Sequence, residues 1–289
     1  MADSPSQIVN GMTVDVEDYV HVGAFADRIA PDDWDAWPSR VEANTERLLA
    51  LFETADVRAT FFVLGWVAER FPDLVRRIVA AGHEVASHGC RHERVDRQGP
   101  ARFREDVRRS KAILEDLAGT AVLGFRAANF SVGAATPWAF PVLAEEGFRY
   151  GSSVNPIRHD HYGWPAAPLG AFRPEGADLV EIPVAATPLG GWRMACGGGG
   201  WFRLYPYALS RALLRRVNRG EGRPAVFYIH PWEIDPDQPR VSGARRSAQL
   251  RHRINLGRTE ARLRRLFADF RWGRMDELFL AGAPSTRRH

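Results

Sequence analysis

Two histidines stand four residues apart in the stretch EVASHGCRH, residues 84–92. In a helical turn, side chains at positions i and i+4 share one face, so His88 and His92 could bind the same metal ion. Exposed histidine pairs are also common on protein surfaces. A carboxylate from another part of the chain would favour the metal site, because two histidines and one carboxylate form a familiar zinc site. Cys90 lies between them and is expected to be a buried thiol that points off their shared face.

Acidic side chains are concentrated in TVDVEDY, residues 13–19. If a β-strand continues through this stretch, Asp15 and Glu17 point to one side, because alternate strand residues share a face. If the strand ends at Val16, Asp18 can turn inward instead. Glu17 and Asp18 are therefore both candidate metal ligands. The ordinary alternative for these acids is a helix cap or a solvated turn.

Arg126 and His230 each follow an apolar run, VLGF and AVFYI respectively. A buried arginine needs an acidic partner, and we expect Asp15 to be that partner and to stay ionised through the pairing. An imidazole titrates near neutral pH, which suits His230 to the role of a general acid. The alternative for His230 is a core histidine bonded to the backbone.

The elements that must position these groups alternate along the chain. Apolar runs predict strands at 8–16, 57–65, 83–88, 121–127, 148–154, 179–185 and 224–231. Amphipathic segments predict helices at 39–55, 67–83, 99–119, 136–147, 205–220 and 254–270. Such alternation predicts an α/β fold, a distorted (β/α) barrel of about seven parallel strands. Active sites of parallel barrels lie at the C-terminal strand ends, where all the candidate residues fall.

Composition narrows the class of protein. The 289 residues are 45% hydrophobic and carry a formal net charge of +4. We expect one domain over 1–289, with a core at about 8–235 and a C-terminal extension at about 236–281 packed on it. The small charge excess gives little support to a nucleic-acid partner. Two cysteines make no disulfide framework, and no signal peptide or transmembrane segment is recognisable, so a cytoplasmic location is expected.

The motifs resemble those of the NodB-homology polysaccharide deacetylases, carbohydrate esterase family four. TVDVEDY resembles the family's first motif, Thr-Phe-Asp-Asp-Gly, although Tyr19 replaces its glycine. HGCRH resembles the second motif, with Gly89 after the first histidine, and FRAANF and YIHP resemble the third and fifth. HPWEIDP and RHRINLGRTEARLRRLF resemble a subgroup associated with exopolysaccharide and exosortase gene clusters. The fourth motif, which orients the catalytic acid, has no clear match, and Glu181 or Trp232 are candidates for that role.

The resemblance implies a hydrolase that removes N-acetyl groups from amino-sugar residues of a polysaccharide or oligosaccharide precursor. It implies a divalent metal, with zinc expected and cobalt, nickel, manganese or iron as alternatives. His88, His92 and Glu17 or Asp18 would hold the metal, and Asp15 would be the general base. His230 would be the general acid, and Arg126 would hold Asp15. A backbone N–H near Asn129 would stabilise the oxyanion.

A glycan that contains N-acetylhexosamine is the expected partner. Aromatic faces pack well on sugar rings, so we expect a stacking groove from the loop residues Phe130, Trp164, Trp192 and Trp201, with core packing as the alternative for each. The glycine-rich run 195–206 predicts a flexible loop near the mouth of the site, with a plain connector as the alternative. Two other functions compete: an allantoinase-like hydrolase of small cyclic amides on the same scaffold, and a non-catalytic glycan-binding module whose metal site has decayed.

Overall fold

Strand β1 (Val9–Val16) lies at the centre of the computed structural model, which describes residues 8–159 and 162–280. It pairs in parallel with β2 (Thr60–Val63) and with β9 (Val226–Ile229), and its first residues pair with β10 (Arg271–Gly273). Met12, Val14 and Val16 are fully buried in the core, and Asp15 therefore points to the opposite face. This register carries Asp15 to the C-terminal edge of the sheet.

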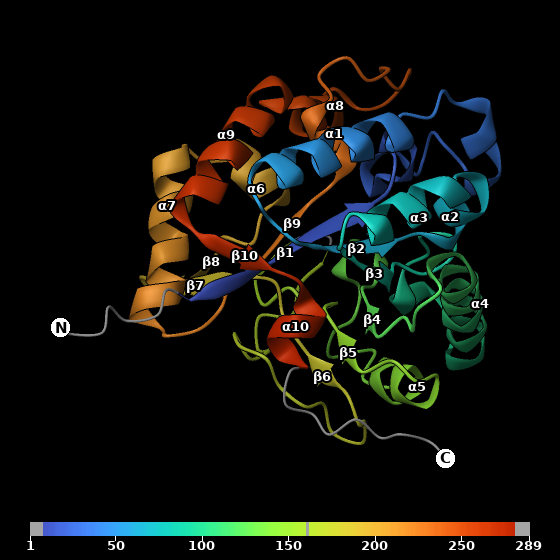
Figure 1. Ribbon diagram of the computed structural model, residues 1–289, viewed down its shortest axis with the longest axis horizontal. Coiled ribbons are helices and arrows are strands. Elements are labelled where there is room, and N and C mark those ends of the chain that lie inside the picture. The colour runs from blue at the N-terminus through green and yellow to red at the C-terminus, as the bar shows by residue number, and fades with distance from the viewer. Residues whose placement is uncertain (1–7, 160–161, 281–289) are drawn as a thin grey trace.

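The sheet continues outward from β2 through β3 (Glu84–Ser87), β4 (Gly124–Phe125), β5 (Tyr150–Gly151) and β6 (Val180–Glu181). Seven parallel strands, from β9 to β6, curl into a half-barrel with helices packed outside it (Figure 1). Beyond β6, the Ala185 N–H donates to the Val226 carbonyl, so the chain returns to β9. The predicted class, a single-domain distorted (β/α) barrel, is confirmed.

The helices follow the strands as predicted, with one division. The segment predicted as one helix at 67–83 forms α2 (Gly65–Arg70) and α3 (Pro72–Ala80). Pro72 has no N–H and restricts the residue before it, so it begins a new helix. The other long helices are α1 (Val41–Thr54), α4 (Pro100–Ala118), α5 (Ala139–Glu145), α7 (Tyr207–Arg215) and α9 (Leu256–Asp269). None of the helices in the described ranges is long and apolar enough to cross a membrane.

Several short elements were not predicted. They are the hairpin β7 (Ala186–Leu189) and β8 (Trp192–Ala195), and the helices α6 (Gly199–Leu204), α8 (Arg246–Arg253) and α10 (Met275–Phe279). The run predicted as a flexible loop at 195–206 is thus ordered. Gly198 (φ 109°) lies against β9, where a Cβ atom would come within 2.0 Å of the Tyr228 carbonyl oxygen. The glycines allow close backbone approach, a use that composition alone does not distinguish from flexibility.

The C-terminal extension is built into the sheet. Its strand β10 pairs with β1 at Val9–Gly11, ahead of the point where β2 begins. Just after β10, the Met275 N–H donates to the hydroxyl of Thr60 at 2.8 Å. The extension is therefore part of the sheet, since β10 pairs with the first residues of β1.

Candidate active site and metal centre

Asp15 and Arg126 form a buried ion pair across the barrel. Asp15 lies next to the last residue of β1, Arg126 follows β4, and 2.6 Å separates Arg126 Nη1 from Asp15 Oδ1. The guanidinium also donates to the hydroxyls of Thr13 and Ser152 and to the Ser152 carbonyl, and it lies 4.1 Å above the ring of Phe62. A fully buried arginine with this many partners fixes the carboxylate it faces.

Glu17, His88 and His92 form the cluster of potential metal ligands in the described part of the chain. One ligand atom from each lies within 4.8 Å of the others, and all three side chains are largely buried. His88 Nδ1 donates to the Arg126 carbonyl oxygen at 2.8 Å, because a carbonyl can only accept. The proton therefore sits on Nδ1, and the Nε2 lone pair of His88 is left available for a metal.

The two histidines meet through a loop. The HxxxH spacing predicted a helical turn, but residues 88–92 are irregular, with left-handed backbone at Gly89 (φ 77°) and His92 (φ 51°). Their ring centroids lie 5.2 Å apart. Cys90 between them is buried, and its N–H donates to the Asp106 carboxylate at 3.1 Å. Burial raises the pKa of the Cys90 thiol to about 11, so it is a protonated thiol outside the cluster, as expected.

The cluster fits a divalent cation. Glu17 Oε2 is buried and lies 2.8 Å from His92 Nε2, yet among the described residues it receives no hydrogen bond. Burial raises the pKa of Glu17, but the nearby His92 and His230 outweigh it and hold that pKa far below its usual value. Burial lowers the pKa of His88 to about 4, so this imidazole is neutral at neutral pH. An ionised carboxylate and neutral imidazoles are the donors that zinc-type ions bind.

Asp18, the second candidate ligand, lies outside this cluster. Strand β1 does end at Val16, the case in which Asp18 was expected to turn inward, but the Glu17 N–H bonds back to the Asp15 carbonyl and Glu17 faces the site. The Asp18 carboxylate instead caps two helix starts, accepting hydrogen bonds from Tyr19, Ser39, Arg40 and Val41. The geometry therefore favours Glu17 over Asp18 as the carboxylate ligand, because capping satisfies Asp18 completely.

His230 lies near both acids and is closest to the Glu17 oxygen that does not face His92. Its Nε2 lies 3.3 Å from Glu17 Oε1 and 3.9 Å from Asp15 Oδ2, and its Nδ1 lies 2.6 Å from Glu233 Oε1. Burial lowers the pKa of His230, but the carboxylates of Glu17, Glu233 and Asp15 together outweigh burial and raise it to about 9. The ring is therefore protonated at neutral pH and directs its Nε2–H toward the two catalytic-site acids.

The residue that orients His230 was missed in the sequence. Glu233, in the turn η7 (Pro231–Ile234), holds His230 Nδ1 and is itself paired with the buried Arg203 at 2.5 Å. Its sequence signal is a carboxylate three residues after the histidine in HPWE, the spacing of a capping box. Glu181, one of the two predicted candidates, is wrong for this role. Its Oε1 accepts from the N–H groups of Ser153 and Val154 instead.

Trp232, the other predicted candidate, supports the site from behind. Its ring stacks on His230 with centroids 5.0 Å apart and an interplanar angle of 18°. Its Nε1–H lies 3.3 Å from Glu17 Oε1, to which it donates. One side chain thus positions both the imidazole of His230 and the carboxylate of Glu17.

A cavity of about 100 Å³ opens over these groups. Asn129 and Phe130 line it, both with left-handed backbone (φ 53° and 48°), and so do the unpredicted Tyr162 and Tyr228. Tyr228 could have been found, because on a strand it shares a face with His230 two residues later. The predicted Trp164, Trp192 and Trp201 do not line the cavity. Trp192 is 69% exposed on hairpin β7–β8, and Trp164 and Trp201 pack against the hydrophobic core.

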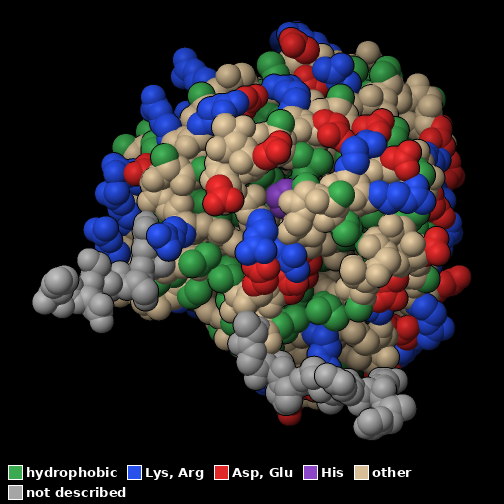
Figure 2. Space-filling model, in the orientation of Figure 1, with side chains coloured by type: hydrophobic (Ala, Val, Ile, Leu, Met, Phe, Trp, Pro, Cys, Tyr) green, Lys and Arg blue, Asp and Glu red, His purple; other side chains and the backbone are tan. Residues whose placement is uncertain are grey.

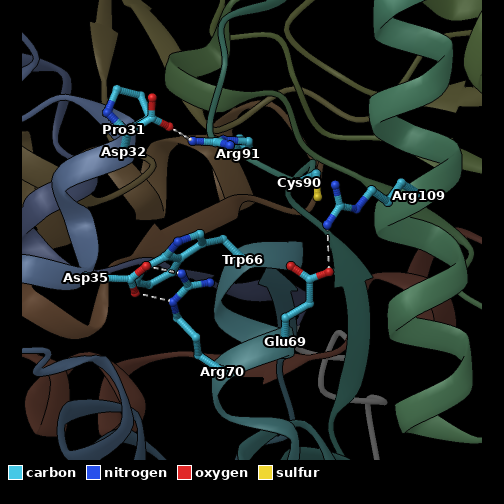
Figure 3. A pocket seen from close by; sticks show the side chains of 9 residues that line it. All are labelled: Pro31, Asp32, Asp35, Trp66, Glu69, Arg70, Cys90, Arg91 and Arg109. Atoms are coloured by element: carbon cyan, nitrogen blue, oxygen red, sulfur yellow. Dashed lines mark hydrogen bonds and ion pairs between the residues drawn. The ribbon is translucent and has the colours of Figure 1, made fainter.

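A second, larger cavity of about 290 Å³ is lined by Cys90 and Arg91 of the loop between the two histidines, and by residues of α2, α4 and the segment at 31–35 (Figure 3). Its charged side chains neutralise one another in pairs: Arg70 with Asp35, Arg91 with Asp32, and Arg109 with Glu69. It holds no member of the metal-ligand cluster. The Arg91–Asp32 pair ties the loop to the segment before α1, and the smaller cavity is the better candidate for chemistry.

Comparison with known proteins agrees with this geometry. Residues 32–150 match the family model described as polysaccharide deacetylase, and residues 152–280 match a domain of unknown function, DUF3473. A peptidoglycan deacetylase of Helicobacter pylori is 30% identical over 138 residues, which are 46% of this chain and 44% of that protein. A chitooligosaccharide deacetylase of Bradyrhizobium is 27% identical over 175 residues, 61% of this chain and 71% of that protein.

A crystal structure assigned as a polysaccharide deacetylase from Mycobacterium smegmatis shares the fold, with a TM-score of 0.62 at 22% identity over 95% of this chain and 90% of that chain. The match to the Helicobacter pylori protein spans less than half of that protein's length. Residues 32–150 are thus similar in sequence to the polysaccharide deacetylase family, and the chain as a whole shares the fold of the Mycobacterium smegmatis structure.

Proposed function

We propose that this protein is a metal-dependent hydrolase that removes N-acetyl groups from amino-sugar residues of a polysaccharide or oligosaccharide precursor. One observation carries the proposal: the cluster of Glu17, His88 and His92 opens into the same cavity as Asp15 and His230. The relatives in Helicobacter pylori and Bradyrhizobium are named as deacetylases of peptidoglycan and chitooligosaccharide, which supports an N-acetylated glycan as substrate.

Glu17, His88 and His92 would hold the metal ion. When bound there, a divalent ion supplies a Lewis acid that lowers the pKa of water and polarises a carbonyl. Asp15 accepts the proton of the attacking water as general base. Arg126 keeps the Asp15 carboxylate in place through their 2.6 Å contact, so the base needs no reorientation when the substrate arrives.

His230 serves as the general acid. An amide nitrogen leaves poorly unless it is protonated, and the imidazolium of His230 faces the cavity with its Nε2–H. Glu233 holds the other ring nitrogen and fixes the orientation of the ring. The backbone N–H at Asn129, which lines the cavity, would stabilise the oxyanion, because the N–H of Ala127 already donates to the Ser153 hydroxyl.

Finer features of the proposal follow from the same residues. Zinc is the proposed ion, because a site of two imidazoles and one carboxylate with open positions is typical of catalytic zinc. We propose an exopolysaccharide precursor, handled in the cytoplasm, as the substrate. The stretches HPWEIDP and RHRINLGRTEARLRRLF, which resemble the exopolysaccharide-associated subgroup, support this assignment.

The test is mass spectrometry of N-acetylhexosamine oligomers after incubation with metal-replete protein, with and without a chelator. Loss of acetyl groups that the chelator abolishes is the expected result. Small cyclic amides form the parallel substrate panel. If the protein hydrolyses the cyclic amides and leaves the oligosaccharides unchanged, the allantoinase-like function is established instead. If the protein binds metal fully but hydrolyses neither panel, the proposed hydrolase is contradicted.

A further inference from the structure

The segment that follows His230 and Glu233 in the sequence contains several arginines without an acidic partner in the described part of the chain. Residues 238–259 contain six arginines and no Asp or Glu. Five of them are exposed and form no ion pair with any described residue, and the four that lie on α8 or before it, Arg240, Arg245, Arg246 and Arg251, are called the basic strip below. Elsewhere arginines are commonly paired, as Arg104 is with two glutamates, and basic and acidic side chains lie next to each other over much of the face in Figure 2.

Like charges held together on an ordered segment repel one another. The strip lies on α8 and the turn before it, and this segment is anchored through its buried residues: His252 Nε2 bonds to Gln238 Oε1 at 2.7 Å, and Gln249 donates to the Val241 carbonyl. The backbone positions of these arginines are therefore fixed by the packing of α8 and the turn before it. A concentration of positive charge that the fold does not neutralise is expected where an anionic ligand binds.

The basic strip adjoins the proposed active site. The His252 ring on α8 stacks on Trp232 with centroids 4.4 Å apart, and Trp232 stacks on His230. On its other side His252 contacts the ring of Phe25 at 4.9 Å. In Figure 1 the chain leads from β9 toward α8. The helix α8, which carries Arg246 and Arg251, thus packs through His252 behind the indole that stacks on the proposed general acid.

Arg251 also acts on the cavity itself through its charge. Burial raises the pKa of Tyr162, which lines the cavity, and the charge of Arg251 is among the smaller effects that lower it. The charge of Arg251 thus adds to the positive potential at the cavity.

We infer that the basic strip binds the acidic groups of an anionic glycan whose N-acetylhexosamine residue occupies the cavity. This inference rests on the proposed function and narrows its substrate class from N-acetylated glycans in general to those that carry carboxylate or phosphate groups. Arginine suits this task, because its planar guanidinium pairs with such groups in a bidentate manner.

The same features disfavour other polyanions. Exposed aromatic rings, on which the bases of single-stranded nucleic acid stack, are absent from the described residues 240–251. The helix α8 buries only His252 and exposes one large apolar side chain, Leu250, so it lacks the apolar face with which an amphipathic helix enters a membrane.

The test compares two probes that share N-acetylglucosamine: a fluorescent hyaluronan hexasaccharide, which is acidic, and chitohexaose, which is neutral. Their affinities for the full chain are measured by fluorescence anisotropy at low and physiological salt. The strip variant carries Arg245→Glu, Arg246→Glu and Arg251→Glu. The control variant carries Arg219→Glu, Arg265→Glu and Arg271→Glu, the same change of charge on exposed arginines that also form no ion pair with a described residue.

We expect the wild-type chain to bind the acidic probe more tightly, and increasingly so at low salt. The strip variant should lose about tenfold or more in affinity for hyaluronan and little for chitohexaose, while the control variant keeps both. Equal affinity of the wild-type chain for the two probes, or equal losses in the two variants, would overturn the inference. So would strip-dependent binding of single-stranded RNA or of phosphatidylglycerol vesicles by a chain that does not discriminate between the two sugars.

This experiment separates the inference from the proposed function, because it measures binding without turnover. A chain that prefers the acidic probe through the strip but deacetylates no oligosaccharide would uphold the strip and contradict the hydrolase. A chain that deacetylates chitohexaose but has no preference for the acidic probe would uphold the hydrolase and contradict the role of the basic strip.

Discussion

Glu233 Oε1 lies 2.6 Å from Nδ1 of His230, and both residues belong to one tight turn at the end of β9. Because Glu233 is fully buried and paired with Arg203, its charge is held in one place. Three residues of a single turn thus provide the proposed general acid, the indole of Trp232 that stacks on it, and the carboxylate that orients it.

Replacing Glu233 should weaken the general acid. In Glu233→Gln the carboxylate that helps to raise the pKa of His230 to about 9 is lost, so the pKa falls. Activity that needs protonated His230 is lost as pH rises through that pKa, so the alkaline limb of the kcat/KM profile should move to lower pH. We expect kcat/KM at pH 7.5 to fall about 10- to 100-fold. Glu233→Asp, which keeps the charge, should restore part of the alkaline limb, and an unchanged limb in Glu233→Gln would contradict the role.

Metal binding should depend on Glu17 and not on Asp18. A ligand that binds only the folded state stabilises it, by about 2.7 kcal/mol when present at 100 times its Kd. Saturating zinc should therefore raise the melting temperature of the wild-type chain but not of Glu17→Gln or of the double variant His88→Ala/His92→Ala. Asp18→Asn should lower the melting temperature of the metal-free chain, because a helix cap contributes about 1 kcal/mol, and it should keep the zinc-induced rise. If the zinc-induced rise in melting temperature is lost in Asp18→Asn and kept in Glu17→Gln, Asp18 and not Glu17 is the carboxylate ligand.

The Asp15–Arg126 pair should be strongly coupled. Arg126→Met leaves the buried Asp15 carboxylate without its cation, which costs about 3–5 kcal/mol of unfolding free energy. Asp15→Asn removes the proposed base and should abolish turnover while zinc binding persists. Chemical denaturation of the wild-type chain, both single variants and the double variant gives the coupling energy. Additive losses would show that the contact contributes nothing beyond its parts.

Local rules predicted much of the framework. The period-two pattern of β1 and the rule that a buried arginine needs an acid together predict that Asp15 faces Arg126, which lies 111 residues later. The order of strands and helices likewise follows from apolar periodicity. Strand β10 and hairpin β7–β8 were missed because such short strands are defined by their pairing partners, which lie elsewhere in the sequence.

The direction of Glu17 and Asp18 depended on a distant element. Beyond the end of a strand, alternation no longer decides where a side chain points. Asp18 turns away because the start of α1, more than twenty residues later, offers it the N–H groups of Arg40 and Val41. The approach of His88 and His92 depended in the same way on left-handed backbone at Gly89 and His92, which the spacing of the histidines does not reveal.

Glu181 should make stability fall as pH rises through the acidic range. Burial raises its pKa from 4.5 to about 7, against two backbone N–H donors that lower it. Between these values the folded state keeps a proton that the unfolded state has released, so stability decreases from about pH 4.5 to 7 and is constant above. The contribution is about 3 kcal/mol for a fully buried group.

Glu181→Gln tests this sign directly. Both N–H donors bond to Oε1, while Oε2 has no partner among the described residues, so an amide reproduces the protonated acid. The variant should match the wild-type chain near pH 4.5 and exceed its unfolding free energy by up to about 3 kcal/mol at pH 8. Urea denaturation at both pH values measures the difference. If the variant is instead less stable than the wild-type chain at pH 8, the ionised carboxylate of Glu181 stabilises the fold and the expected sign is wrong.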